Sequence, residues 1–326
     1  LGPPKSLIGN QVRHILNILS IFLFSFISIS CTSSSSTSST TSTDNSTTTG
    51  LFVTVGVLGT ILTSSDGTTW DNRTSGASDK LWDVTYGNGL FVTGGVSGTI
   101  LTSSDNGTSW DNRTSGTTET LYGVTYGNGL FVTGGYSGTI LTSSDNGTTW
   151  DNRTSGTLLV LIGVTYGNGT FVTVGQSGTI LTSPDGTTWD NRTYAETSDL
   201  YEVTYGNGLF VTVGKSGTIF TSSDGTSWTE RDSGISGSGK FLYGVTYGNG
   251  LFVTVGTGTI RTSSDGISWT ERTSGTTWSL YGVTYGNGLF VTVGGSGILL
   301  TSPDGLYWTE RTSGTSRNLQ GVTYSQ

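Results

Sequence analysis

The chain has 326 residues, of which 52 are glycine and 11% are charged, and its formal net charge at pH 7 is −8. An acidic balance of this kind repels phosphate backbones, so we expect no nucleic-acid partner. The single cysteine excludes an intrachain disulfide.

Residues 1–30 have the composition of an export signal. Two basic residues precede a run of fifteen mostly apolar residues, 15–29, which is short for a bilayer span but suits a signal-peptide core. The run ends in the letters SIS before Cys31, and this end resembles a bacterial lipobox, although Ser28 stands where that motif usually has leucine. The resemblance implies diacylation of Cys31 and a membrane-anchored bacterial lipoprotein, periplasmic or at the cell surface. An ordinary signal peptide and an uncleaved anchor stay open as alternatives.

Residues 31–49 are almost wholly serine and threonine. Such a segment cannot bury apolar surface, so we expect a flexible tether between the signal and a folded domain at residues 50–326.

Residues 50–326 repeat one pattern seven times. Each copy contains a turn such as SSDNGTSW, which ends in tryptophan, and successive tryptophans are 39 to 41 residues apart. A period of this length, with about four short strands per unit, is typical of propeller blades. We therefore predict an all-β fold, a seven-bladed β-propeller of four-stranded blades. The tryptophans are Trp70, Trp110, Trp150, Trp189, Trp228, Trp269 and Trp308.

One unit shows the predicted strands in chain order. Residues 121–127 form the inner strand, and the Asn-Gly pair at 128–129 makes a tight hairpin turn that needs positive φ. Residues 130–135 and 139–144 form the second and third strands, and 149–154 the outermost strand. No long stretch has the 3.6-residue period of a helix.

The two ends of the repeated region complement each other. Gly50–Gly56 reads as a second strand, and Leu319–Gln326 reads as an inner strand. We predict that the C-terminal strand completes the N-terminal blade and closes the ring, which leaves no unpaired inner strand.

The seven turns resemble the Asp-box, or BNR, repeat (Ser-x-Asp-x-Gly-x-x-Trp) of sialidase-like and photosystem II assembly factor-like propellers. The copies that end at Trp110 and Trp150 fit fully, and the other five are one residue shorter. The resemblance implies that the aspartate ties its turn to backbone donors and has a structural role, so it indicates the fold and not the function. These aspartates are Asp66, Asp105, Asp145, Asp185, Asp224, Asp265 and Asp304.

The sequence contains no recognisable catalytic constellation. Residues 50–326 contain no histidine, and Cys31 precedes them, which excludes Ser-His-Asp and Cys-His catalysis and zinc sites with such ligands. Seven arginines share one repeat position on the outermost strand, away from the channel, so they do not form the arginine cluster of a sialidase. We expect no metal and no cofactor.

The seven copies differ from one another mainly on one face of the ring. The turns from second to third strand and the blade-joining loops both emerge there, and they supply the candidate ligand contacts Tyr136, Lys215, Lys240 and Trp278. A position at the start of the inner strand is aromatic in five copies, including Trp82, Tyr201 and Tyr281. These rings either bind a sugar or peptide at the channel mouth or wedge between blades as core.

The next position is glycine in five copies but Asp83 and Glu202 in two. These carboxylates are predicted to face each other across the mouth, farther apart than the roughly 5–9.5 Å of a glycosidase pair. Nothing in the sequence separates their pKa values. Ligand contacts and ordinary loop residues stay open as interpretations.

Together these features predict an exported, lipid-anchored, monomeric and non-enzymatic module that binds a glycan or a protein through its variable face. The alternatives are an assembly or scaffold factor for membrane protein complexes, a glycosidase, and a purely structural surface repeat protein. The photosystem-type relatives carry an arginine patch, whereas here Arg261 and Arg317 are the arginines of the repeated region outside the outer-strand set.

Overall fold

The computed structural model describes residues 1–2, 50–193, 198–235 and 239–325. The apolar run, Cys31 and the Ser/Thr-rich segment lie outside the described residues, so the predictions on them stay predictions. The fold described below lies within one compact unit, Thr48–Gln326. No helix in the described ranges is long and apolar enough to cross a membrane.

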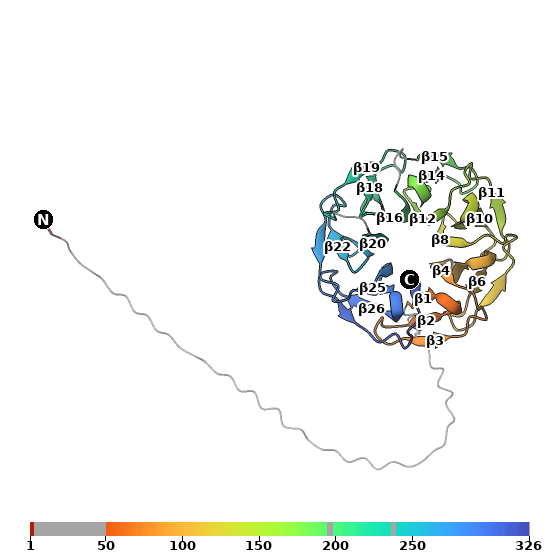
Figure 1. Ribbon diagram of the computed structural model, residues 1–326, viewed down its shortest axis with the longest axis horizontal. Helices are drawn as coiled ribbons and strands as arrows, with labels where there is room; N and C mark the ends of the chain where they lie inside the picture. Colours follow the sequence, from red (N-terminus) through yellow and green to blue (C-terminus); the bar gives the residue numbers. More distant parts are fainter. Residues whose placement is uncertain (3–49, 194–197, 236–238, 326) are drawn as a thin grey trace, which may run out of the picture. The chain divides into compact units, whose positions relative to one another are not determined.

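The described part of the second unit forms seven four-stranded antiparallel sheets arranged as blades around a central channel (Figure 1). This arrangement confirms the seven-bladed propeller. The inner strands are β4 (Leu81–Gly87), β8 (Leu121–Gly127), β12 (Leu161–Gly167), β16 (Leu200–Gly206), β20 (Leu242–Gly248), β24 (Leu280–Gly286) and β28 (Leu319–Tyr324). The second strands are β5 (Leu90–Gly95), β9 (Leu130–Gly135), β13 (Thr170–Gly175), β17 (Leu209–Gly214), β21 (Leu251–Gly256), β25 (Leu289–Gly294) and β1 (Phe52–Gly56).

The two outer strands of each blade are shorter. The third strands are β6 (Ile100–Ser103), β10 (Ile140–Ser143), β14 (Ile180–Ser183), β18 (Ile219–Ser222), β22 (Ile260–Ser263), β26 (Leu299–Ser302) and β2 (Ile61–Ser64). The outermost strands are β7 (Asp111–Arg113), β11 (Asp151–Arg153), β15 (Asp190–Asn191), β19 (Thr229–Arg231), β23 (Thr270–Arg272), β27 (Thr309–Glu310) and β3 (Asp71–Arg73). Short 3₁₀ turns join second to third strands at η1 (Val57–Gly59), η2 (Val96–Gly98), η3 (Tyr136–Gly138), η4 (Gln176–Gly178) and η5 (Gly295–Gly297).

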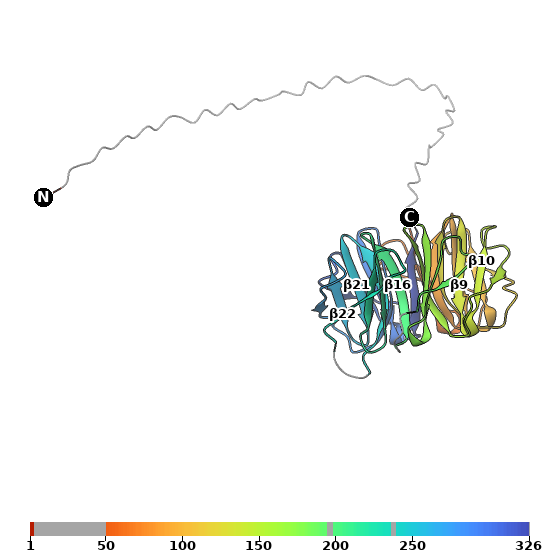
Figure 2. The same ribbon diagram turned by 90° about the horizontal axis from the view of Figure 1, so that it is seen from above.

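The ring closes by pairing the two ends of the repeated region, as predicted. Strand β28 pairs antiparallel with β1 from Phe52 opposite Tyr324 to Gly56 opposite Leu319. Beyond these strands, the Ser325 backbone N–H donates to the Leu51 carbonyl at 2.9 Å. The chain therefore enters and leaves the propeller on one face, and Figure 2 shows the C-terminus at that face.

The hydrophobic core lies between neighbouring blades. One cluster joins Val53 and Val55 of β1 to Leu81 and Phe91 of the next blade, and each of these side chains is at most 1% exposed. The ring of Phe91 packs near those of Tyr86 and Trp110, with centroid distances of 4.7 Å and 6.4 Å. Burial of a large apolar side chain stabilises the fold by roughly 1.5–3 kcal/mol. Because each cluster spans a blade boundary, the blades stabilise one another.

The Asn-Gly pairs form the expected tight hairpins between inner and second strands. Asn128 has φ 50° and Gly129 has φ 78°. Two successive positive φ values define a type I′ turn, which matches the twist of the flanking strands and favours asparagine followed by glycine.

The aspartate turns between third and outermost strands are tied by hydrogen bonds. Asp66 Oδ1 accepts the backbone N–H groups of Thr68 and Thr69, each at 2.8 Å, and Trp70 Nε1 donates to the Gly67 carbonyl at 3.0 Å. In a longer copy, hydrogen bonds from the side chain and backbone of Ser109 lower the pKa of Asp105 to about 2. The assignment of these turns to the Asp-box family stays a prediction.

Candidate functional site

The inner strand of each blade begins with a β-bulge, which the sequence did not reveal. In the blade of β4, Leu81 pairs with Gly95 and Asp83 with Gly94, so Trp82 is the extra residue. A bulge re-aims a side chain that would otherwise follow the regular alternation of the strand. The residues at this position are Trp82, Tyr122, Ile162, Tyr201, Tyr243, Tyr281 and Gln320.

All seven bulge residues line one cavity of about 490 Å³ in the channel. The bulge lies at the end of the inner strand next to the 3₁₀ turns, since the Val96 N–H of η2 donates to the Lys80 carbonyl at 2.9 Å. The cavity is therefore the channel mouth on the variable face. The chain enters the propeller at Gly50 on the opposite face.

The aromatic bulge residues are half-buried, and this combines the two interpretations drawn from the sequence. Each ring contacts a ring of a neighbouring blade, with centroid distances of 5.5 Å for Tyr201–Tyr243 and 5.4 Å for Tyr243–Tyr281. Trp82 and Tyr122 form a similar pair at 5.0 Å. The rings thus pack between blades on one side and border the cavity on the other.

The residue after the bulge is glycine in five blades because the neighbouring inner strand leaves no room for a Cβ atom. A Cβ on Gly163 would lie 2.7 Å from Glu202 Cα, and one on Gly282 would lie 2.6 Å from the Gln320 carbonyl oxygen. Asp83 and Glu202 interrupt this glycine ring and bring two carboxyl groups to the cavity wall.

The two carboxyl groups make different hydrogen bonds. Asp83 Oδ2 accepts the Val124 N–H of the next blade at 3.1 Å. Glu202 Oε1 accepts the adjacent Val203 N–H at 2.9 Å, and no hydrogen bond from a described residue reaches its Oε2. One oxygen of Glu202 is therefore available to a ligand.

Both acids have raised pKa values, and no feature of the sequence indicated this shift. Burial raises the pKa of Asp83 to about 6, against opposing hydrogen bonds from the Val124 and Val84 backbone. Burial also raises the pKa of Glu202 well above its ordinary value, and the charge of Asp83 raises it further. Although they lie three blades apart, the two groups interact across the cavity.

Lys80 is a cavity residue that we missed. Its Nζ lies 3.1 Å from the centroid of the Trp82 ring, a cation–π arrangement, and burial lowers its pKa to about 8. The Trp82 Nε1 atom is buried without a hydrogen-bond partner among the described residues. Lys80 belongs to a variable blade-joining loop. Its position two residues before Trp82 was the one feature of the sequence that indicated a place near the cavity.

The other sequence candidates lie outside the cavity. Tyr136 and Trp278 are 51% and 53% exposed, and Lys215 and Lys240 are exposed on the same face. Tyr136 raises the pKa of Tyr122 through its charge, a smaller effect than burial, which places Tyr136 near the cavity rim. The structure therefore brings together Trp82, Asp83, Tyr201, Glu202 and Tyr281 but not these four.

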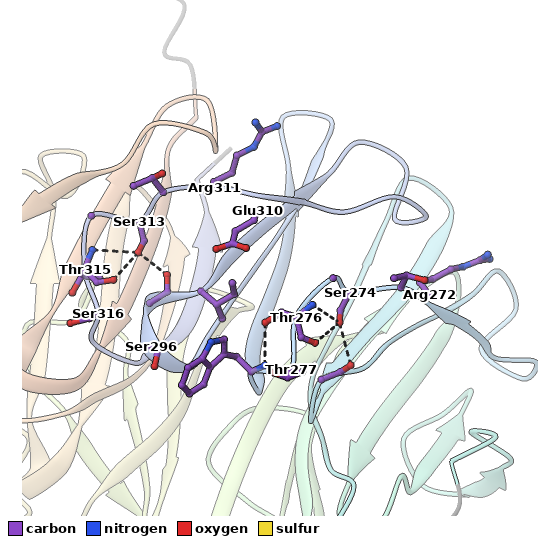
Figure 3. A pocket seen from close by; sticks show the side chains of 18 of the residues that line it. Arg272, Ser274, Thr276, Thr277, Ser296, Glu310, Arg311, Ser313, Thr315 and Ser316 are labelled. Atoms are coloured by element: carbon purple, nitrogen blue, oxygen red, sulfur yellow. Dashed lines mark hydrogen bonds between the residues drawn. The ribbon is translucent and has the colours of Figure 1, made fainter.

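A larger, polar groove of about 1500 Å³ lies between the loops that follow β23 and β27 (Figure 3). Ser313 Oγ donates to the Gly297 carbonyl at 2.6 Å, and Ser274 Oγ donates to the Gly258 carbonyl at 3.2 Å. These hydroxyl groups hold the two loops in place. Within the described ranges, no group of three or more His, Cys, Asp or Glu side chains is placed to hold a metal ion.

Comparison with known proteins supports the fold. The family model of the DUF6242 beta propeller domain matches residues 202–322. The structure of YCF48 bound to D1 peptide has a TM-score of 0.63 and 19% identity, covering 76% of this chain and 86% of that chain. YCF48 from Cyanidioschyzon merolae has a TM-score of 0.60 and 17% identity, covering 76% and 90%. The WD40 propeller domain of Doa1 has a TM-score of 0.59 and 17% identity, covering 84% and 88%. No curated protein sequence is significantly similar to this chain.

Proposed function

We propose that this protein is a non-enzymatic binding module that holds a segment of another protein at its channel mouth. The observation that carries the proposal is the convergence of seven bulge residues, one from each blade, on a single cavity. Its volume of about 490 Å³ is within the usual range of small-ligand sites, roughly 300–1,000 Å³. A cavity of this size accepts one or two side chains of a docked peptide rather than a folded domain.

The cavity wall has features that suit a peptide. Half-buried rings such as Tyr201 and Tyr243 offer rigid apolar contact area at low entropic cost. The YCF48 structure with a D1 peptide shows that a propeller of similar fold binds a peptide, which supports the proposal at the level of the fold.

We further propose export and anchoring through a lipid on Cys31. The chain enters the propeller at Gly50, on the face opposite the channel mouth, so a tether joined there would leave the mouth unobstructed. Such an anchored receptor would suit a scaffold or assembly factor for membrane protein complexes, the alternative that the YCF48 likeness favours. Replacing Cys31 with serine is expected to release the protein from membranes during fractionation.

A random-peptide library selected against the full chain tests the proposed function. We expect enriched peptides whose binding weakens about tenfold or more in Trp82→Ala and Tyr201→Ala variants, as is usual for buried aromatic contacts. Tyr307→Ala is the matched control, because Tyr307 is 78% exposed in a turn at the opposite face. A library that yields no peptide sensitive to either cavity substitution would overturn the proposal. A glycan array run in parallel tests the other ligand class expected from the sequence.

A second candidate, a glycosidase, is favoured by one observation. Retaining and inverting enzymes need one protonated and one ionised carboxyl group in the same site. Asp83 and Glu202 border one cavity, and the charge of Asp83 keeps Glu202 protonated to higher pH. Hydrolysis of chromogenic aryl glycosides by the wild type, abolished in Glu202→Gln and in Asp83→Asn, would establish this activity. If the wild type hydrolyses none of these aryl glycosides, the glycosidase candidate is excluded for these substrates.

A further inference from the structure

We propose that the channel mouth is a receptor for a cationic side chain, a lysine or arginine of the bound segment, held by Glu202 and its neighbouring tyrosines. The inference rests on the proposed function and specifies the ligand that the cavity selects. Along the ring, Tyr201 is on the same strand as Glu202 and Tyr243 is on the next blade, while Tyr281 lies two blades away.

The charges that line the cavity do not balance. Three of the lining residues are charged at some pH near neutrality: Lys80, Asp83 and Glu202. Lys80 and Asp83 belong to the same short segment at the start of β4. Glu202 lies three blades away on β16, and no lysine or arginine among the lining residues accompanies it. On the side of Glu202 the cavity therefore has an acid without a basic partner among the lining residues.

The opposite side of the mouth already shows what a cation does there. The Lys80 ammonium lies over the face of Trp82, with Nζ 3.1 Å from the ring centroid. Aromatic faces attract cations through the ring quadrupole, most strongly where water is partly excluded. Tyr201, Tyr243 and Tyr281 also border the cavity, and no lysine or arginine of the described residues lies over them. Tyr243 in addition stacks on Phe241 at a centroid distance of 5.7 Å. One half of the ring thus holds a cation over an aromatic face, and the other half has aromatic rings without one.

Glu202 has the features of a group that awaits a counterion. Its Oε1 is held by the Val203 N–H at 2.9 Å, which fixes the carboxyl group and leaves Oε2 without a partner among the described residues. Burial and the charge of Asp83 raise the pKa of this carboxyl, so a nearby positive charge would favour its ionised form. A lysine ammonium or arginine guanidinium would donate to Oε2 and lower the pKa of Glu202, so binding would favour release of its proton to solvent. An anionic ligand would be repelled by Asp83, and a neutral one would leave Glu202 without a counterion.

The test begins with the selected peptides and their neutral isosteres. For each peptide that binds the full chain, every lysine is replaced in turn by acetyl-lysine and every arginine by citrulline, and affinities are measured by titration calorimetry. We expect one cationic residue per peptide whose neutral isostere binds about tenfold to a hundredfold more weakly, as for a charge-assisted hydrogen bond in a partly buried site. Glu202→Gln is expected to remove this difference, and Glu230→Gln, on the exposed strand β19, is expected to keep it.

Proton release separates a direct role of Glu202 from a structural one. Calorimetry in two buffers of different ionisation enthalpy is expected to show that the wild type releases more protons than Glu202→Gln when each binds the same cationic peptide, because Asp83 still titrates in the variant. Circular dichroism and thermal unfolding check that the variant is folded, and the carboxamide retains an oxygen that accepts the Val203 N–H.

Each remaining outcome has a definite meaning. Peptides that bind and depend on Tyr201, but whose neutral isosteres bind equally well, would overturn the cation inference and leave the proposed function intact. A cation dependence that persists in Glu202→Gln would also overturn it, because the cation would then lie elsewhere. The absence of any peptide that depends on Trp82 or Tyr201 would overturn the inference together with the proposed function.

Discussion

The carboxylate of Asp83 on β4 accepts a hydrogen bond of 3.1 Å from the backbone N–H of Val124 on β8, so an ionisable group links two neighbouring blades. In five of the seven blades the residue at this position is glycine, and the inner strands approach each other without a side chain between them. The hydrogen bond favours the charged form, but burial opposes it more strongly and raises the pKa of Asp83 to about 6. The ionised group therefore weakens the fold at neutral pH.

Asp83→Asn is expected to stabilise the protein at pH 7. Because the folded-state pKa of about 6 lies above the ordinary value of 3.8, folded Asp83 holds its proton more tightly than the unfolded chain does. This contribution to the free energy of unfolding is complete below about pH 4 and is lost as the pH rises through 6. The gain from the substitution should therefore grow from pH 4 to pH 7. Urea unfolding of both proteins across this range measures it.

Other titratable groups near Asp83 also affect how the stability difference between Asp83→Asn and the wild type changes from pH 4 to pH 7. Glu202 shifts in the same direction, and its repulsion with Asp83 disappears in the variant. Lys80 has a pKa of about 8 and keeps its charge below that pH, while Tyr122 stays neutral because burial raises its pKa. A stability difference that does not change between pH 4 and pH 7 would contradict the raised pKa.

Gly163→Ala is expected to destabilise the ring by roughly 1–3 kcal/mol, as overpacking at a fixed contact does. The added Cβ would lie 2.7 Å from Glu202 Cα and 2.9 Å from the Tyr201 carbonyl oxygen, and backbone atoms cannot move aside as a flexible side chain can. Gly94→Ala is the control, because its Cβ would lie 3.3 Å from Leu121 Cβ at a position that is valine in five other blades. Equal effects on the midpoint of urea unfolding would show that the glycine ring is not required for close packing.

Asp66→Ala is expected to lower stability by roughly 1 kcal/mol, a value discounted because the carboxylate is exposed. The substitution removes the acceptor of the Thr68 and Thr69 N–H groups, whereas Asp66→Asn keeps one oxygen in the same place. The alanine variant should therefore lose more than the asparagine variant. Hydrogen bonds from the Thr69 and Thr68 N–H groups and the Thr68 hydroxyl lower the pKa of Asp66, so its contribution is present above about pH 4 and lost as the pH falls further. A pH-independent loss in the alanine variant would argue against this origin.

The fold could be predicted because the sequence repeats its local rules seven times. The Asn128-Gly129 pair specifies a type I′ turn by itself, and the position of Leu319 relative to the last blade specifies closure. Both are properties of a few adjacent residues or of the repeat count, so they do not depend on knowing which side chains meet in space.

The site could be predicted only in part, because it depends on where backbones meet. The side-chain period of a strand gives two faces, but the bulge at Trp82 adds a residue and changes which side chain borders the channel. The raised pKa of Glu202 comes from burial and from Asp83, which is 119 residues away in the sequence. Lys80 is in a loop whose composition is unremarkable, and its contact with Trp82 follows from the bulge geometry.

Removal of residues 319–326 is expected to abolish cooperative folding of the ring. Strand β28 supplies the inner strand of the N-terminal blade and pairs with β1 over five residue pairs. Without it, Phe52 and Leu62 lose the packing of Leu319 and Val322 within one core cluster, and β1 becomes an unpaired edge. A synthetic peptide of residues 319–326 added in trans should restore a single thermal transition. Its midpoint should rise with peptide concentration, because the peptide binds the folded state and not the unfolded chain. A peptide of the same composition in scrambled order is the control. A truncated chain that unfolds at the wild-type temperature without either peptide would show that ring closure contributes little to stability.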